Sequence, residues 1–119
     1  MSGRTDREFL RDIQEGIRRI REYCRTPTAL TYDQFRADIR TQDAVIRNLE
    51  IIGEATKNLS PDLRDKYPDV PWKGMAGIRD RLIHQYFGIN LDIVWDIATG
   101  ELPDLASQIN RILRHEDKD

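Results

Sequence analysis

The sequence predicts an all-α protein, an up-and-down antiparallel helical bundle with four to five main helices. Three observations lead to this prediction. Apolar residues recur at steps of three and four along most of the 119-residue chain. No segment shows the two-residue alternation that is typical of a strand. Capping patterns and prolines separate the helical stretches, and the loops between them are short enough to make neighbouring helices antiparallel.

The first predicted helix begins at a capping-box pattern formed by Thr5 and Glu8. We expect it to stop near Arg25, because Pro27 disfavours helical backbone in Thr26. Its apolar stripe consists of Phe9, Ile13, Ile17, Ile20 and Cys24.

The second predicted helix begins at another capping box, formed by Thr31 and Gln34, and continues to about Asn58 with room for a bend. This helix is long for a domain of this size and exceeds what one protomer can cover, which suggests a dimer. Its apolar positions are Phe35, Ile39, Val45, Ile46, Leu49, Ile52 and Ala55.

A short helix is expected over 61–66, because Ser60 can cap it and Pro61 suits the first helical position. A loop with two prolines follows over 67–72. The next helix is predicted from about Trp72 to Phe87, with Gly88 ending it. Its apolar stripe is Met75, Ile78, Leu82 and Tyr86.

Two further helices complete the prediction. Asn90 can cap a helix that holds Ile93, Val94, Trp95 and Ile97, and the stretch 99–103 reads as a break. The last helix carries Leu105, Ile109, Ile112 and Leu113, and we expect residues 114–119 to form a frayed end. We therefore interpret residues 1–119 as a single domain with an ordered core over about 5–113.

The composition limits the kinds of molecule that the protein can bind. Hydrophobic residues make up 39% of the chain and charged residues 34%, which is typical of a richly charged globular domain. The formal net charge is -2, so any grip on nucleic acid must depend on a local basic cluster. Cys24 is the single cysteine, which excludes an internal disulfide and favours a cytoplasmic setting. The sequence shows no membrane-spanning run, signal peptide, phosphate loop or metal-ligand spacing, so we expect no membrane association, cofactor or metal.

The helix predicted over 72–87 carries unusual polar residues. On a helical wheel of about 100° per residue, Arg79 lies at the border between the apolar stripe and the polar face. Asp80 and His84 are four residues apart on the polar face, where they could form a hydrogen bond. Each has an ordinary explanation as a surface charge or a weak surface pair, and Tyr86 alone reads as a core tyrosine.

The same residue types also suit RNA cleavage. Histidine has an unperturbed pKa of about 6.5, so it can accept or donate a proton near neutral pH. Arginine keeps its charge and offers a planar fork that matches phosphate oxygens. One Arg79–His84 pair supplies few functional groups for this chemistry, but a symmetric dimer would bring two such pairs together.

At these residues the sequence resembles the HepT-like branch of the HEPN superfamily, whose motif is R-x-x-x-x-H-x-Y. The motif reads here as Arg79, the four residues DRLI, His84, Gln85 and Tyr86. The stretches LEIIGEATKNLS (49–60), PWKGMAGIRDRLIHQYFGINLDIVW (71–95) and LPDL (102–105) are similar to family sequence in the family's order. The resemblance covers most of residues 5–113.

The resemblance implies a metal-independent endoribonuclease that cleaves tRNA or mRNA in a composite cleft of a homodimer. Arg79 and His84 would be the catalytic residues. The implied partner is a minimal, MntA-like nucleotidyltransferase antitoxin of a type VII-like toxin–antitoxin system. That partner would transfer AMP from ATP to Tyr86 and silence the toxin.

Two acidic residues stand beside this motif. The family favours a polar residue, often Asn, directly after the motif arginine, and here Asp80 has that place in a supporting role. A carboxylate next to His84 would raise the pKa of the imidazole, which suits a general acid. Glu54 also matches family sequence, and it reads either as an exposed helix residue or as a carboxylate that orients Arg79.

Two other functions stay open at this level. The acidic balance and the small site are compatible with a non-catalytic helical protein that binds a minimal nucleotidyltransferase and presents nucleic acid or a substrate to it. A purely structural dimer is the third interpretation, against which the border position of Arg79 argues weakly.

Overall fold

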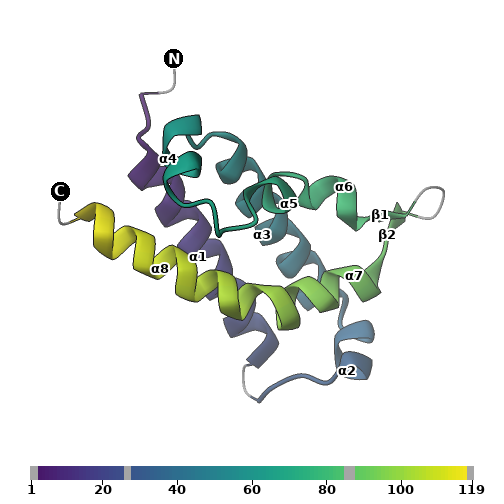
Figure 1. Ribbon diagram of the computed structural model, residues 1–119. Coiled ribbons are helices and arrows are strands. Elements are labelled where there is room, and N and C mark those ends of the chain that lie inside the picture. The colour runs from purple at the N-terminus through teal and green to yellow at the C-terminus, as the bar shows by residue number, and fades with distance from the viewer. Residues whose placement is uncertain (1–2, 26–27, 85–87, 118–119) are drawn as a thin grey trace.

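The computed structural model describes residues 3–25, 28–84 and 88–117, and of His84 it describes the backbone. Helices account for almost all regular structure in these ranges, with one pair of two-residue strands (Figure 1). The prediction of an all-α fold is confirmed. In Figure 1 the C-terminal helix α8 crosses in front of the N-terminal helix α1, and α3 lies behind the central helices.

Helix α1 (Asp6–Arg25) has the predicted bounds and buries the predicted stripe. The Thr5 hydroxyl oxygen accepts a hydrogen bond from the backbone N–H of Glu8, at 3.2 Å, as the capping pattern indicates. The burial of the Cys24 side chain raises the pKa of its thiol. This helix packs mainly against α3 and also against α8.

The second predicted helix is in fact two helices, α2 (Tyr32–Arg36) and α3 (Ile39–Lys57). The capping box of Thr31 and Gln34 is confirmed. The prediction missed that Asp38 caps a new helix, since its carboxylate accepts hydrogen bonds from the Thr41 hydroxyl and backbone N–H. These bonds lower the pKa of Asp38. Because the chain changes direction here, Ile39 falls off the buried stripe and is 69% exposed.

Ser60 caps α4 (Pro61–Lys66) as predicted. The helix predicted over 72–87 is wrong in two respects. It is divided at Gly77 into α5 (Trp72–Ala76) and α6 (Ile78–Leu82), and it ends at Leu82. The buried part of the stripe, at Met75, Ile78 and Leu82, is confirmed. Its last member, Tyr86, lies outside the described residues.

Beyond α6 the chain forms an antiparallel strand pair, β1 (Ile83–His84) and β2 (Gly88–Ile89). The backbone N–H of Asn90 donates to the carbonyl oxygen of Leu82 at 2.7 Å, which closes the pair at its base. Gly88 was predicted to end a helix, but it lies in β2 with a φ of +79°. That left-handed backbone favours glycine, so Gly88 serves the hairpin.

Helix α7 (Leu91–Asp96) is capped by Asn90, as predicted. The predicted break at 99–103 is wrong, because a π-helical turn, η1 (Ile97–Glu101), joins α7 to α8 (Leu102–Asp117). Its wide turn is marked by a bond from the Leu102 N–H to the carbonyl oxygen of Ile97. Burial of Ile97, Ala98 and Leu102 holds this segment in the core despite Gly100.

Helix α8 extends to Asp117, past the point at which the sequence predicts a frayed end. The ammonium of Lys66 contacts the Glu116 carboxylate at 2.8 Å, and the Arg7 guanidinium contacts the Asp117 carboxylate at 2.9 Å. The hydrogen bond from Lys66, followed by that from Tyr67, lowers the pKa of Glu116 to about 2. These side-chain contacts tie the C-terminal turn to α1 and α4. Along the described part of the chain, no helix is both long enough and apolar enough to cross a membrane.

Helices α1 and α3 approach each other closely at Gly16. A Cβ atom at Gly16 would lie 2.8 Å from Cγ1 of Ile52, a fully buried residue of α3. A side chain at this position would therefore push the two helices apart. Gly100 is a matched contrast, because a Cβ there would meet nothing within 4 Å.

These two glycines predict opposite effects of the same substitution. We expect Gly16→Ala to lower the free energy of unfolding by about 1 kcal/mol or more, because overpacking a core costs about 1–3 kcal/mol. Gly100→Ala should be neutral or stabilising by up to about 1 kcal/mol, since it only restricts the unfolded chain. Urea denaturation of both variants measures the difference. Equal effects of the two substitutions would contradict the close α1–α3 contact.

Candidate functional site

Arg79 is exposed on α6 and lines a surface hollow of about 190 Å³ between α3 and the α5–α6 segment. Glu54, which the sequence left open as either an exposed helix residue or a carboxylate that orients Arg79, is exposed on α3 and lines the same hollow. The structure therefore brings these two residues to one site, although they are far apart in the sequence. The complete lining is Arg47, Glu50, Gly53, Glu54, Lys57, Ala76 and Arg79.

Gly53 of α3 lines this hollow and lies close to α5 and α6. A Cβ atom at Gly53 would lie 3.2 Å from the carbonyl oxygen of Met75 and 3.6 Å from Cβ of Ile78. Glycine thus lets the backbone of α5 approach α3 closely. Because Arg79 directly follows Ile78, this contact holds the arginine over the charged face of α3.

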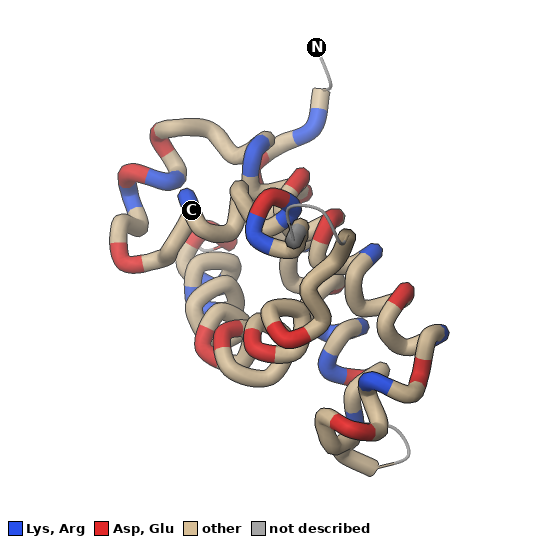
Figure 2. The backbone as a smooth tube through the Cα atoms, turned by 90° about the vertical axis from the view of Figure 1, so that its right-hand side faces the viewer, with Lys and Arg blue, Asp and Glu red and all other residues tan. Residues whose placement is uncertain are grey.

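The hollow holds three cationic and two anionic side chains. Within residues 3–25, 28–84 and 88–117, none of the five forms an ion pair or a side-chain hydrogen bond with another residue. The Arg79 guanidinium therefore keeps its charge and its donors available for an anion from outside. Figure 2 shows basic and acidic positions interleaved along the helices, so a net attraction for anions must be local.

The neighbouring Arg81 has a different environment. Its guanidinium makes two hydrogen bonds to the Glu101 carboxylate, at 2.6 and 3.1 Å, which join α6 to η1. The hydrogen bond to Glu101 raises the pKa of Arg81. Arg81 thus has a structural partner that Arg79 lacks among the described residues. The sequence singled out Arg79 through the motif, but it could not show this difference in the partners of the two arginines.

The predicted helical pairing of Asp80 with His84 is wrong, because α6 ends at Leu82 and the backbone of His84 is in β1. Asp80 itself is exposed on α6. The His84 side chain and the whole of Tyr86 lie outside what the structure describes. The backbone places His84 opposite Gly88, on the strand that follows directly from the helix of Arg79.

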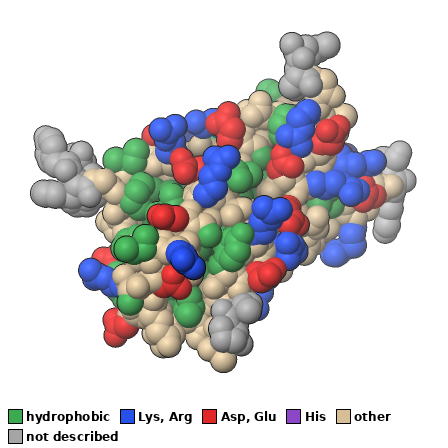
Figure 3. Space-filling model, turned by 180° about the vertical axis from the view of Figure 1, so that it is seen from behind, with side chains coloured by type: hydrophobic (Ala, Val, Ile, Leu, Met, Phe, Trp, Pro, Cys, Tyr) green, Lys and Arg blue, Asp and Glu red, His purple; other side chains and the backbone are tan. Residues whose placement is uncertain are grey.

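The strand pair that carries His84 also presents apolar surface. Ile83 and Ile89 are cross-strand partners, and they are 51% and 40% exposed. The face of the molecule seen from behind likewise shows apolar side chains among charged ones (Figure 3). The sequence predicted a helix at residue 83 and therefore missed this pair, although the β-branched Ile83 and Ile89 on either side of Gly88 were a usable signal.

In the described ranges no three His, Cys, Asp or Glu side chains gather in an arrangement that could hold a metal ion. Arg79, with Arg47 and Lys57 beside it, supplies fixed positive charge to the hollow, alongside the carboxylates of Glu50 and Glu54. Such a site can bind a phosphate or another oxyanion.

The fold and site define a class of small helical domains in which an arginine without a partner in the described ranges lies at a charged surface hollow. Comparison with known proteins identifies the family. A sequence model described as ribonuclease HepT-like matches residues 13–112. The chain belongs to the HepT-like ribonuclease family, which confirms the resemblance found in the sequence.

Three relatives illustrate the similarity. A candidate RNase of Methanocaldococcus jannaschii is 50% identical over 108 residues, which cover 91% of this chain and 87% of that protein. A candidate ribonuclease HepT of Thermococcus cleftensis is 39% identical, with 92% and 96% of the two chains covered. A candidate RNase of Caldanaerobacter subterraneus is 40% identical, with 95% and 98% covered. No solved structure matches the chain.

Proposed function

We propose that this protein is a metal-independent endoribonuclease in which Arg79 binds the scissile phosphate and His84 transfers a proton. The observation that supports this most is the Arg79 guanidinium over the hollow on α3, which has no ion-pair partner among the described residues, in a chain whose relatives are named as candidate RNases. Arg79 lies five residues before His84, at the spacing of the R-x-x-x-x-H motif.

The proposed reaction uses the imidazole of His84 and the guanidinium of Arg79. The 2′-oxygen of the RNA attacks the phosphorus, and the bond from phosphorus to the 5′-oxygen breaks. The imidazole takes the proton from the 2′-hydroxyl, and an imidazolium gives a proton to the departing 5′-oxygen; free histidine has a pKa of about 6.5, which suits both transfers near neutral pH. The Arg79 guanidinium stabilises the negative charge that develops on the phosphate oxygens.

We further propose that the site is completed in a homodimer, because one arginine and one histidine supply few groups for both proton transfers. The exposed pair of Ile83 and Ile89 beside His84 offers apolar surface that a second copy would cover. The mixed charges of Arg47, Glu50, Glu54 and Lys57 offer ion pairs to the same charges of a symmetric partner.

The proposed regulator is an MntA-like nucleotidyltransferase antitoxin that transfers AMP to Tyr86, as in a type VII-like toxin–antitoxin pair. Support comes from the extended motif, in which Tyr86 follows His84 by two residues. An AMP group on this segment would add a bulky anion close to Arg79 in the sequence. It would compete with the RNA phosphate for the guanidinium.

The net charge of -2 favours one alternative, a non-catalytic helical partner of the nucleotidyltransferase. In that case Arg79 would bind the nucleotide or an acidic surface of the transferase, and RNA would stay intact.

We expect the purified protein to cleave RNA in the presence of EDTA. Arg79→Ala should lower the cleavage rate about 10²–10³-fold through lost charge stabilisation. His84→Ala should lower it about 10²–10⁴-fold through lost proton transfer. Gel analysis of labelled RNA measures the rates. The matched control is Arg114→Ala, which removes an exposed arginine from α8, and urea denaturation should show all variants folded. Cleavage at the parental rate by Arg79→Ala and His84→Ala would contradict the proposed roles.

The proposed regulation predicts that AMP is added covalently to Tyr86. After incubation with the nucleotidyltransferase and ATP, intact-mass spectrometry should show added AMP units, and RNA cleavage should fall. Tyr86→Phe should gain no AMP and should stay active. The control is Tyr67→Phe, because the Tyr67 hydroxyl donates a hydrogen bond to Glu116 in the C-terminal turn. This control variant should still gain AMP. Addition of AMP to Tyr86→Phe would contradict the assignment of the acceptor.

A further inference from the structure

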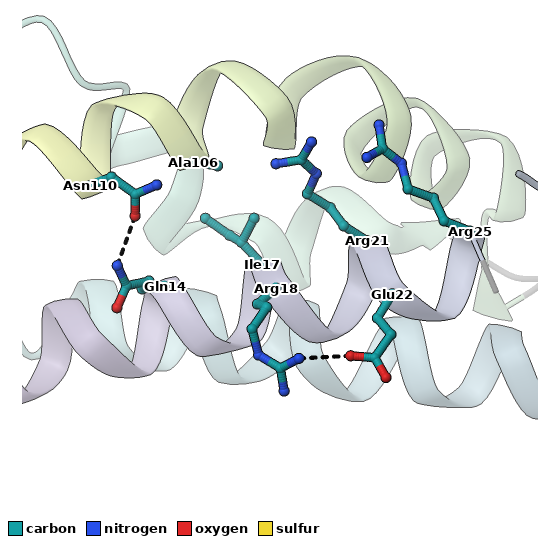
Figure 4. Close-up of a pocket in the computed structure, with 8 residues that line it drawn as sticks. All are labelled: Gln14, Ile17, Arg18, Arg21, Glu22, Arg25, Ala106 and Asn110. Atoms are coloured by element: carbon teal, nitrogen blue, oxygen red, sulfur yellow. Dashed lines mark hydrogen bonds and ion pairs between the residues drawn. The ribbon is translucent and has the colours of Figure 1, made fainter.

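A second groove lined by arginines lies between α1 and α8; its volume is about 560 Å³, and it shares no lining residue with the Arg79 hollow. Figure 4 shows the side chains that line it. They are Gln14, Ile17, Arg18, Arg21, Glu22, Arg25, Ala106 and Asn110.

The arginines that line this groove differ in whether a carboxylate already neutralises their charge. Arg18 contacts the carboxylates of Glu15 and Glu22, at 2.7 Å each, so its charge is neutralised. Arg21 and Arg25 have no ion pair or side-chain hydrogen bond to any residue in the described ranges. In Figure 4 both extend from α1 towards α8, away from the Arg18–Glu22 pair. The groove therefore holds two uncompensated guanidinium groups on one side.

The remaining walls are neutral. The Gln14 amide donates to the Asn110 side-chain oxygen at 2.7 Å and joins α1 to α8 at one end of the groove. Ile17 and Ala106 supply apolar surface between the helices. The lining contains no acidic residue other than Glu22, which Arg18 already engages. An anionic strand can thus approach Arg21 and Arg25 without facing an unpaired carboxylate of the lining.

We propose that this groove is a second contact surface for the RNA substrate, where Arg21 and Arg25 bind phosphates of the backbone outside the cleavage site. The proposal rests on the ribonuclease function proposed above. A protein with a net charge of -2 needs a local basic cluster to hold RNA, and this groove supplies one. Arg21 and Arg25 are one helical turn apart, so their Cβ atoms lie about 5–6 Å from each other.

That spacing favours RNA over an acidic peptide as the occupant. Successive phosphates along one strand are separated by a similar distance, so each guanidinium can take one phosphate in its planar fork. The apolar surface of Ile17 and Ala106 can then contact a sugar or base. Because the groove binds substrate without touching the scissile bond, its loss should raise KM and leave kcat nearly unchanged.

The test measures binding of a fluorescein-labelled, 2′-O-methyl single-stranded RNA, which the proposed reaction cannot cleave, by anisotropy at several salt concentrations. We expect Arg21→Gln/Arg25→Gln to reduce the slope of log affinity against log salt by about 1.4, the value for two phosphate contacts to a single strand. The matched control is Arg11→Gln/Arg19→Gln, which removes two charges from the same helix at residues paired with Asp117 and Glu15. The control should change the slope by less than half as much.

An unchanged slope for the groove variant, or equal slope changes in the two variants, would overturn the proposal. A groove variant with a lower unfolding temperature and an unchanged slope would also overturn it, because Arg21 and Arg25 would then contribute only to the stability of the helix. Displacement of the RNA by poly-glutamate at equal charge concentration would show that the groove takes acidic peptides instead. RNA cleavage by the parent is scored separately. If the parent cleaves RNA and the groove variant leaves the slope unchanged, only the proposed role of the groove is contradicted. If the groove variant lowers the slope but the parent does not cleave RNA, only the proposed ribonuclease function is contradicted.

Discussion

The position of α3 between two close helix contacts is the constraint on which the rest of the structure depends. Gly16 of α1 lets that helix lie against Ile52 of α3, and Gly53 lets α5 approach α3 at the carbonyl of Met75. The first contact fixes the bundle, and the second fixes α6 relative to α3. Arg79 lies over the charged face of α3 as a consequence, with the hollow between them.

Sequence periodicity predicted the buried surfaces better than it predicted where helices end. The stripes of α1 and α3 and the caps at Thr31, Ser60 and Asn90 follow local rules, because each cap depends on a side chain and the next turn. The end of α6 depends on a distant partner, since Asn90 bonds to Leu82 only when the hairpin is formed. The turn η1 likewise stays helical because its apolar residues are buried by tertiary packing, which no local pattern contains.

The candidate site was predictable in its residue types and not in its geometry. The spacing of Arg79 and His84 pointed to phosphate chemistry, and a place for Glu54 near Arg79 was one of two alternatives. The sequence could not show that Arg81 is engaged by Glu101 while Arg79 has no partner in the described ranges, because those contacts join segments 20 or more residues apart. Nor could it show that Arg21 and Arg25 face a groove, since that depends on how α8 crosses α1.

The central claim is that Arg79 binds the scissile phosphate in a cleft that two copies of the chain share. The most direct measurement is a crystal structure of the protein with a 2′-O-methyl RNA, in which the nucleophile is blocked. The account predicts a symmetric dimer with a backbone phosphate within hydrogen-bonding distance of the Arg79 guanidinium and with His84 of either copy beside the adjoining sugar. A dimer that buries Arg79 away from the RNA, or an RNA bound only at other surfaces, would contradict it.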